Sequence, residues 1–539
     1  MNAVRPGAPA AQRWRAARGR AVHLALGLAL IAAAPGRAAA AVSPAEPEVQ
    51  LVYRPPAAAP VAPVEPVERG RRALLEFSTL LLFENIRYWE ANSFVEDWQF
   101  KLTWKEQKDK LLGLEGVRFD SNRFGTNWTH AFAGGLYYDF GRANSLGVKD
   151  SLLLATFEAL YWELVVEWRK VVSVNDLVST IFGGFSMGEP YYQLTRYLLT
   201  RESPVARALG FVNPMLGVHA VLDPASRPRP TDAQTLPGHG VSLALGAATV
   251  DSRYASDSGG FASVGLRSRL ALAPGYTAPG AETRQGWEVL SSTADFNLDL
   301  DGGAVHEIDV YSRAVFYGRL ARAVGEDSRG SASVIGLGSA FTLFSKAPLP
   351  GVEDGAVDFS KPLELDGPRN FRDKYAIVHL VGPVYEGFSR GKGIDVAWAV
   401  EAYPDFGLVS AYALNEYSGE HDVSGTKSTL VTSGYYYGYG ASLKALVEAG
   451  AGPVTAGVEV ALHYHTSIEG LDRFEERLSS DVHASDSGIR IDANLQVAIP
   501  RTPLAIETTA RWLSRRGEIG NTVTTGTETR LSLGVVYRL

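Results

Sequence analysis

The side chains of this sequence that could do chemistry are densest between residues 120 and 189. They are carboxylates, amides and one histidine set among tryptophan, phenylalanine and glycine, and the most promising are Asn127, His130, Glu163, Glu167, Asp176 and Glu189. Glu163 and Glu167 are four residues apart in a stretch of helical period, which places them on one helix face. With His130 they could ligate a metal, or serve as base and orienting group in a hydrolase that acts on lipid.

A structural role for these residues is the competing interpretation, and we favour it. Buried carboxylates and amides in a small helical domain must satisfy one another and cap helices. The sequence has no H-E-x-x-H or P-loop pattern, and Gly183, Gly184 and Gly188 suit turns or close packing better than a phosphate cradle. We therefore expect no metal and no cofactor. The candidates for a catalytic role are His130, Glu163, Glu167, Asp176 and Glu189.

The elements that must position these residues are helices. Residues 71–205 show helical periodicity, for example from Leu152 to Val172, where Asp150 is the expected N-cap. Acidic residues such as Glu84 interrupt the apolar stretches, so none of them predicts a membrane span. The Pro- and Ala-rich residues 42–70 read as a stiff linker. We expect a small helical domain that follows this linker.

After about residue 206 the period of the apolar residues falls to two and stays there to the last residue. Residues 488–499 alternate an apolar face beginning at Ile489 with a polar face beginning at Arg490, and residues 531–539 alternate in the same way. Charged faces repeated over many strands are typical of a polar lumen inside a lipid-facing wall. Such strands must all pair, because lipid offers the backbone no hydrogen bonds.

The polar faces of these strands supply the candidates for lining a lumen. They are Arg267, Arg269, Asp295, Asn297, Asp299, Glu459, His463 and His465. Facing acidic and basic walls would suit a selective pore, and they would equally suit a lumen that is braced shut. The tyrosines of residues 435–439 read as part of an aromatic girdle at the membrane surface. Tight turns are expected at residues 301–303, 449–452 and 500–503, whereas the long segment 346–372 does not fit the alternation of short turns and long loops.

The N-terminal residues predict export. Six arginines and no acidic residue lie within residues 1–41, around an apolar run from Ala21 to Ala34 that is typical of a signal peptide. Removing those six charges changes the formal charge from −7 to −13, which argues against nucleic-acid binding. The sequence has no cysteine, which excludes disulfides, thiolate metal sites and lipidation at cysteine.

A resemblance to a known family rests on a series of spaced residues in the helical part. The series comprises Asn127-x-x-His130, Ala133-Gly134, Tyr137-Tyr138, Arg142, Trp162-Glu163-x-x-x-Glu167, Val174-Asn175-Asp176 and Gly183-Gly184-x-x-x-Gly188-Glu189. It resembles a bacterial family that is known only as a domain of unknown function and is found in outer-membrane proteins. The match covers roughly residues 115–200 and implies no assigned chemistry. The chain departs from the family at Ala131 and at Val172-Ser173, where proline is expected after the histidine and before the serine.

These observations predict a mixed α and all-β protein, with a small helical periplasmic domain followed by a transmembrane antiparallel β-barrel of about 12 to 14 strands. The expected domains are a signal peptide (1–41), a linker (42–70), the helical domain (71–205) and the barrel (206–539). The expected surroundings are outer-membrane lipid and the barrel assembly machinery, and small molecules or ions could pass. The leading function is a pore or envelope-maintenance barrel. The alternatives are an outer-membrane enzyme acting on envelope lipid through a His/Glu cluster, and a structural barrel that docks a periplasmic partner.

Overall fold

The computed structural model describes most of the chain beyond residue 68. The described ranges are 69–92, 104–112, 117–119, 124–168, 172–223, 240–252, 259–346, 373–421, 429–430, 434–468 and 482–539. The expected signal peptide and nearly all of the expected linker lie outside these ranges. Residues 70–539 form one compact unit.

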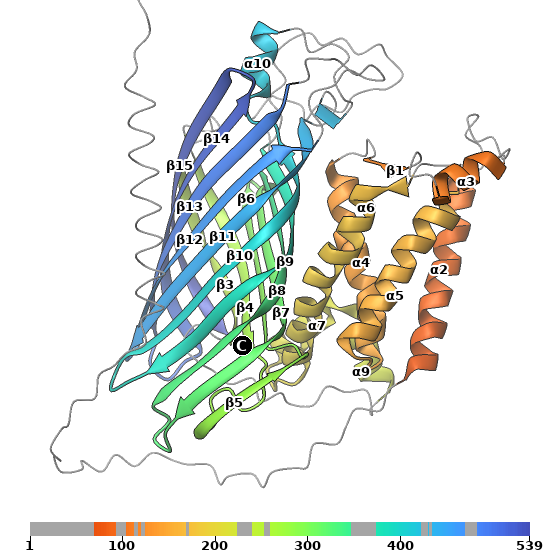
Figure 1. The fold of residues 1–539 in the computed structure, drawn as a ribbon. Coiled ribbons are helices and arrows are strands. Elements are labelled where there is room, and N and C mark those ends of the chain that lie inside the picture. The colour runs from red at the N-terminus through yellow and green to blue at the C-terminus, as the bar shows by residue number, and fades with distance from the viewer. Residues whose placement is uncertain are drawn as a thin grey trace, which may run out of the picture. The chain divides into compact units, whose positions relative to one another are not determined.

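Strands from residue 240 onward close into a β-barrel (Figure 1). One antiparallel sheet holds thirteen strands, and β15 pairs with β3 while β7 pairs with β8, so that all of them except β5 form a closed ring of twelve. The strands are β3 (Gly240–Ser252), β4 (Gly259–Ala271), β5 (Gly280–Gly286), β6 (Ser291–Asp301), β7 (Ala304–Val324), β8 (Gly330–Lys346), β9 (Lys374–Arg390), β10 (Asp395–Ser410), β11 (Tyr435–Ala451), β12 (Val454–Ser467), β13 (Ala484–Ala498), β14 (Leu504–Ile519) and β15 (Thr522–Arg538). The predicted barrel is confirmed, at the lower end of the predicted strand number.

The ends of the barrel explain the segment that did not fit the sequence pattern. We call the end that holds Leu539 the C-terminal rim, and the short turns at 391–394, 452–453 and 499–503 lie there too. The segment between β8 and β9 joins strand ends at the opposite rim, where long connections belong. The tight turn expected at 301–303 is present but lies at the opposite rim. Residues 515–526, whose polar composition suggests a long loop, are instead a hairpin between long strands, so that expectation was wrong.

Helices make up most of the described part that precedes the barrel (Figure 1). They are α2 (Gly70–Asn92), α3 (Trp104–Leu112), α4 (Phe124–Ala143), α5 (Val148–Tyr161) with the π-helical turn η1 (Trp162–Val166), α6 (Val174–Val178), the π-helical turn η2 (Ser179–Gly183), α7 (Gly184–Leu199), α8 (Pro204–Leu209), the 3-10 turn η3 (Gly210–Val212) and α9 (Pro214–Leu222). A short parallel pair, β1 (Val117–Arg118) and β2 (Val172–Ser173), ties two of the connections together. A further helix, α10 (Leu414–Glu420), follows β10.

Two details of the helices differ from expectation or bear on a membrane. Helix α5 begins after Gly147, so Asp150 lies in its first turn instead of at the N-cap. The carboxylate still suits that position because the helix N-terminus attracts negative charge. Within the described ranges, each helix taken singly is too short or too polar to cross a membrane.

Helices α4 and α7 pack tightly on each other and against the barrel wall. A Cβ added at Gly134 of α4 would lie 2.0 Å from the carbonyl oxygen of Thr180, and one added at Gly184 of α7 would lie 2.6 Å from the carbonyl carbon of Gly134. On the wall side, Phe124 and Ala131 of α4 share an apolar cluster with residues of four strands, which are Phe341, Leu343, Ala376, Val378, Phe406, Leu408, Tyr435 and Tyr437. Glycine at the crossing therefore lets the helix pair lie close enough to reach the wall.

The wall residues beneath the helices belong to the outer surface of the barrel. Thr342 and Ile377 line the lumen, so their chain neighbours Phe341, Leu343 and Ala376 point to the other side of the wall. The sequence had suggested that the helices lie on the periplasmic side of the barrel or in its mouth. Their contacts instead run along the outside of the strands.

Candidate functional site

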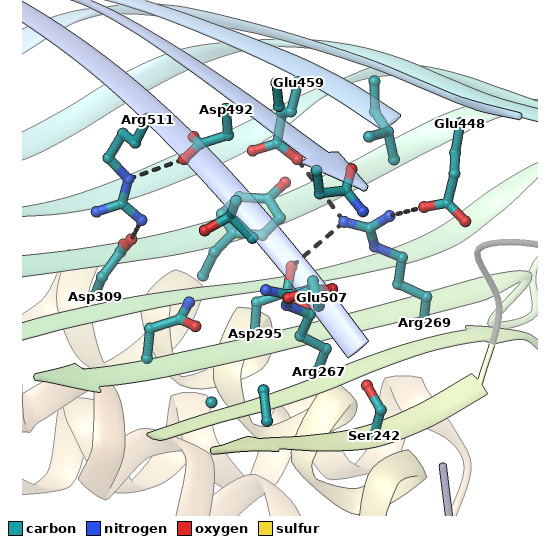
Figure 2. Close-up of a pocket in the computed structure, with 18 of the residues that line it drawn as sticks. Ser242, Arg267, Arg269, Asp295, Asp309, Glu448, Glu459, Asp492, Glu507 and Arg511 are labelled. Carbon is teal, nitrogen blue, oxygen red and sulfur yellow. Dashed lines mark hydrogen bonds and ion pairs between the residues drawn. The ribbon is translucent and has the colours of Figure 1, made fainter. Parts of the chain in front are cut away.

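A charged cavity of about 750 Å³ lies inside the barrel (Figure 2). Its lining comes mainly from β3, β4 and the strands β10 to β15. It reaches the C-terminal rim, since Gly393, Gly452 and Leu539 are among the lining residues. The strand alternation positions the site, because every second side chain of each strand points into the lumen.

Acidic and basic side chains face one another near the C-terminal rim. Arg269 of β4 lies 3.6 Å from Glu448 and 3.9 Å from both Asp295 and Glu459 (Figure 2). Lys444 approaches Glu459 from the neighbouring strand at 3.1 Å. Glu459 belongs to β12, five strands away from β4 around the ring, and Glu448 belongs to β11, six strands away, so these two ion pairs cross the lumen.

A second cross-lumen contact is built around Arg511 of β14. Its guanidinium lies 2.8 Å from Glu307, 2.9 Å from Asp309 and 2.9 Å from Asp492. Glu307 and Asp309 belong to β7, on the far side of the barrel from β14. One side chain therefore bridges opposite walls. Charge-assisted contacts of this kind are stronger than neutral hydrogen bonds.

The opposite rim is filled more completely than the C-terminal rim. Arg515 is fully buried there, with Asp486 at 2.9 Å and Asp373 as its second carboxylate partner. At this rim, side chains of β10, β11, β13, β14 and the segment between β10 and β11 form an apolar cluster. Its members are Val409, Ala411, Ala413, Leu414, Leu430, Tyr436, Ala484 and Ile519. The cavity is thus accessible from the C-terminal rim, and among the described residues the opposite rim is closed by packing and ion pairs.

The β7–β10 side of the lumen is also filled near the C-terminal rim. The segment between β4 and β5 contributes Ala273 and Tyr276 to an apolar cluster with Leu320, Val384 and Phe388. The Tyr276 ring meets Phe388 edge-on at 5.3 Å. The open part of the lumen is therefore lined mainly by β3, β4 and β10–β15, with fewer residues from β6 to β9.

The predicted lumen residues lie on the inner face of the barrel. Arg267, Arg269, Asp295, Asn297, Glu459 and His463 line the cavity. Asp299 is buried 2.6 Å from Arg530, His465 is buried 3.2 Å from Asp405, and His463 lies 3.7 Å from Asp486. The two histidines thus face carboxylates of other strands, which is an ordinary arrangement for a braced lumen.

The predicted helical residues divide into two groups. At the start of α4, Asn127 accepts a 2.7 Å hydrogen bond from Asn175, and His130 lies 3.5 Å from Asp176. Glu163 belongs to the same end, where it accepts the backbone N–H of Ser173 at 2.7 Å. The carbonyl oxygen of Glu167 accepts a 2.8 Å hydrogen bond from Lys110.

The second group lies near the other end of α4. Glu189 is fully buried, and Arg142 pairs with it at 2.8 Å. The Tyr138 hydroxyl at 2.5 Å and the Gln193 amide at 2.6 Å also donate to Glu189. The spacing of the candidates suggested that Asn127, His130, Glu163, Glu167, Asp176 and Glu189 converge in one cluster. Arg142 follows His130 by twelve residues, about 18 Å along a helix, so Glu189 lies apart from His130 and that hypothesis was wrong.

The barrel tyrosines that were expected in an aromatic girdle complete the first helical group. The hydroxyls of Tyr435 and Tyr437 accept hydrogen bonds from the Asn127 amide at 2.6 and 2.8 Å, and both rings are buried. Tyr436 points into the lumen cluster, whereas Tyr439 is exposed and fits a girdle. The period of two predicts that Tyr435 and Tyr437 point outward and Tyr436 inward. It does not predict that helices cover Tyr435 and Tyr437.

Two segments have the G-x-S-x-G spacing of a hydrolase nucleophile motif, which the sequence analysis missed: residues 184–188 and 387–391. Ser186 is buried within α7, donates to the carbonyl of Phe182 and meets Ser339 of the wall at 2.7 Å. Ser389 lies within β9. Neither serine occupies the strand-to-helix turn that exposes such a nucleophile. Among the described residues, no group of three or more acidic or histidine side chains is arranged to hold a metal.

Sequence reasoning also missed most of the basic residues that bridge the lumen. They are Arg313, Lys346, Arg511, Arg515 and Arg530. Each lies on the inner face of a strand, so the period of two could have predicted that its side chain points into the lumen. Their partners lie on strands remote in the sequence, and no periodicity identifies those.

Comparison with known proteins supports the family resemblance. Residues 116–221 match the model of a family described as a domain of unknown function, DUF3943. This confirms the predicted family for that part of the chain, which contains both helical polar groups apart from Lys110 and their barrel partners. No curated protein matches the chain.

Similar solved structures are remote. The translocator domain of the autotransporter NalP from Neisseria meningitidis is 9% identical, with 62% of this chain and 97% of that chain covered and a TM-score of 0.19. The COG4313 outer membrane channel from Pseudomonas putida F1 is 13% identical, with 57% and 99% covered and a TM-score of 0.23. The CymD monoaromatic hydrocarbon channel is 8% identical, with 60% and 92% covered and a TM-score of 0.19. Scores this low transfer no function.

Proposed function

We propose that the protein is an outer-membrane β-barrel whose lumen is a gated pathway for small polar solutes. The observation that carries the proposal is the charged cavity, which is accessible from the C-terminal rim and bridged by ion pairs toward the opposite rim. A lumen of this polarity inside a wall with exposed side chains such as Leu533 and Val535 fits a membrane barrel. The C-terminal rim is then the periplasmic one.

The ion pairs favour a closed resting state over an open pore. Arg511 holds carboxylates of opposite walls together, so a solute can pass only where such contacts separate. The cavity carries both signs of charge at close range, which suits a small solute that is polar or zwitterionic over one of a single charge. Outer-membrane lipid and the barrel assembly machinery are the partners that any such barrel needs.

Conductance of the purified protein in a planar bilayer tests the proposal. We expect low conductance for the wild type and a clear increase with a shift toward cations for Arg511→Ala. The change opens the bridge and leaves Glu307, Asp309 and Asp492 with less compensating positive charge, that of Lys346 and Arg490. Arg319→Ala is the matched control, since that arginine is exposed. If an assembled Arg511→Ala barrel conducts no better than the control, the lumen is structural and the proposal fails.

The periplasmic placement predicted for residues 71–205 stays a prediction. The contacts between helices and barrel support a different placement, beside the barrel wall within the membrane. In the first placement water covers the outer face of the helices, and in the second lipid covers it.

A further inference from the structure

The helices extend over the whole height of the barrel wall. At one end Asn127 of α4 bonds to Tyr435, the first residue of β11 at the opposite rim. At the other end the Tyr197 hydroxyl of α7 donates to the carbonyl of Leu539 at 3.0 Å, at the C-terminal rim. Between them, Phe185 of α7 meets Phe316 of β7 edge-on at 5.4 Å. Because the helices cover the wall from rim to rim, they cannot lie only in the periplasm if the barrel spans the membrane.

The helical unit buries polar side chains beside its apolar core, and it exposes large apolar side chains. Asn127, Glu163, Asp176 and Glu189 are buried within it. The large apolar side chains exposed on α2 and α5 are Leu74, Leu75, Leu82, Phe83, Ile86, Leu153, Phe157 and Leu160, with exposed fractions from 42 to 69%. Soluble helical domains place polar residues on such faces. Large exposed apolar patches mark contact with a membrane or with another protein.

The lengths and levels of the helices match those of the barrel. Helix α4 has 20 residues and α2 has 23, about 30 and 34 Å, close to the thickness of a hydrocarbon core. On α2 the exposed apolar positions end where the exposed pair Arg87–Glu90 begins. Polar residues at both ends of an apolar stretch suit the two surfaces of a membrane.

The chain makes an even number of passes along the wall. Helices α2, α4, α5 and the run α6–η2–α7 alternate in direction, and the start of α2 meets the end of α9 through the 2.8 Å pair of Arg72 with Asp223. Arg72 also bonds to Asn144, at the turn between α4 and α5. The start of α2 and the start of the first barrel strand therefore lie toward the same rim, as four passes require.

The contact between α4 and α7 is also of the kind that membrane helices use. Gly184 and Gly188, spaced as G-x-x-x-G, pack on the backbone of Gly134 and Gly135. Small residues at this spacing let helices approach closely where no hydrophobic effect drives them together.

We infer that α2, α4, α5 and α7 form a layer embedded in the membrane beside the barrel, with the exposed face of α2 and α5 covered by lipid acyl chains. Lipid is the occupant because this face continues the lipid-facing surface of the barrel at the same height. The polar groups of the layer are turned toward the wall and toward one another, so four passes cross together although each helix alone is too polar or too short. The inference rests on the barrel lying in a membrane and not on the gated pathway.

Nitroxide accessibility tests the inference on the full-length protein in phosphatidylcholine vesicles. The chain has no cysteine, so single variants label uniquely. We compare Phe157→Cys and Leu82→Cys with Leu533→Cys on the barrel exterior as the lipid control and Asp327→Cys in an exposed turn as the water control. We expect both helix labels to match Leu533→Cys, with high collision rates for oxygen and low rates for a water-soluble nickel chelate.

The alternatives give different readings. If the helix labels match Asp327→Cys while Leu533→Cys behaves as lipid-exposed, the helices lie in water. That result would overturn the inference and leave the proposed solute pathway unaffected. Helix labels shielded from both reagents would show that protein covers this face, which also overturns it. Two helix positions guard against a local effect of either substitution, and unchanged heat-dependent gel migration reports that each variant is folded.

Discussion

The lumen and the contact between helices and wall both bury charged and polar side chains, but they do so in different ways. In the lumen, single cations serve several carboxylates, as Arg511 does for Glu307, Asp309 and Asp492. In the helical layer, one cation, Arg142, serves one carboxylate, Glu189, and neutral donors complete the site. The first arrangement can rearrange around a missing partner, whereas the second cannot.

The difference follows from what surrounds each region. The lumen contains a cavity of about 750 Å³ in which water can replace a lost contact. The helical layer is close-packed against the wall, and an unpaired charge there has no substitute partner. The two networks are thus distinguished by packing more than by residue type.

The largest expected effect comes from separating α4 and α7. In Gly134→Leu the new side chain meets the backbone of Thr180, so the helices must move apart, at a cost of about 3 kcal/mol or more. Gly125→Leu on the same helix is the control, because nothing lies within 4 Å of its Cβ position. In Gly134→Leu we expect the helices to lose their protease resistance, while the barrel keeps its heat-dependent gel migration. Equal resistance of the two variants would contradict the tight crossing.

Loss of the isolated charge pair should have the next largest effect. Arg142→Ala leaves Glu189 buried and unpaired and should lower the free energy of unfolding of the helices by about 3 kcal/mol. Urea titration followed by helical circular dichroism measures it. Adding Glu189→Gln to Arg142→Ala should restore part of the loss, because the stranded charge is removed. If Arg511→Ala costs the helices as much, the contrast between the two regions is wrong.

The smallest expected effect tests the bond that joins helix to wall. Tyr437→Phe removes one hydroxyl from the Asn127 amide and should cost about 1 kcal/mol, the net contribution of a typical hydrogen bond. Tyr439→Phe, two residues along the same strand face, should have no effect because that ring is exposed. The same urea titration compares the two. Equal costs would show that the hydroxyl at Tyr437 does not tie the helices to the barrel.

The sequence alone determined the periodic features of this protein. The period of two predicted the barrel and the inner face that carries Arg267, Asp295 and Glu459, since strand geometry fixes alternation without reference to partners. Helical period predicted the region that precedes the barrel, and the spaced residues near Asn127 and Glu189 indicated the family. Each of these features is local, so it can be read from neighbours in the chain.

The tertiary structure alone decided which distant residues meet. Closure of the ring sets β7 opposite β14, and only this brings Arg511 to Glu307 across the lumen. Docking of α4 on the wall likewise turned Tyr435 from an expected girdle residue into a partner of Asn127, and it left Glu189 with Arg142 instead of His130. These contacts depend on strand order, register and helix packing. They are properties of the whole fold, and the spacing of residues along the chain does not predict any one of them.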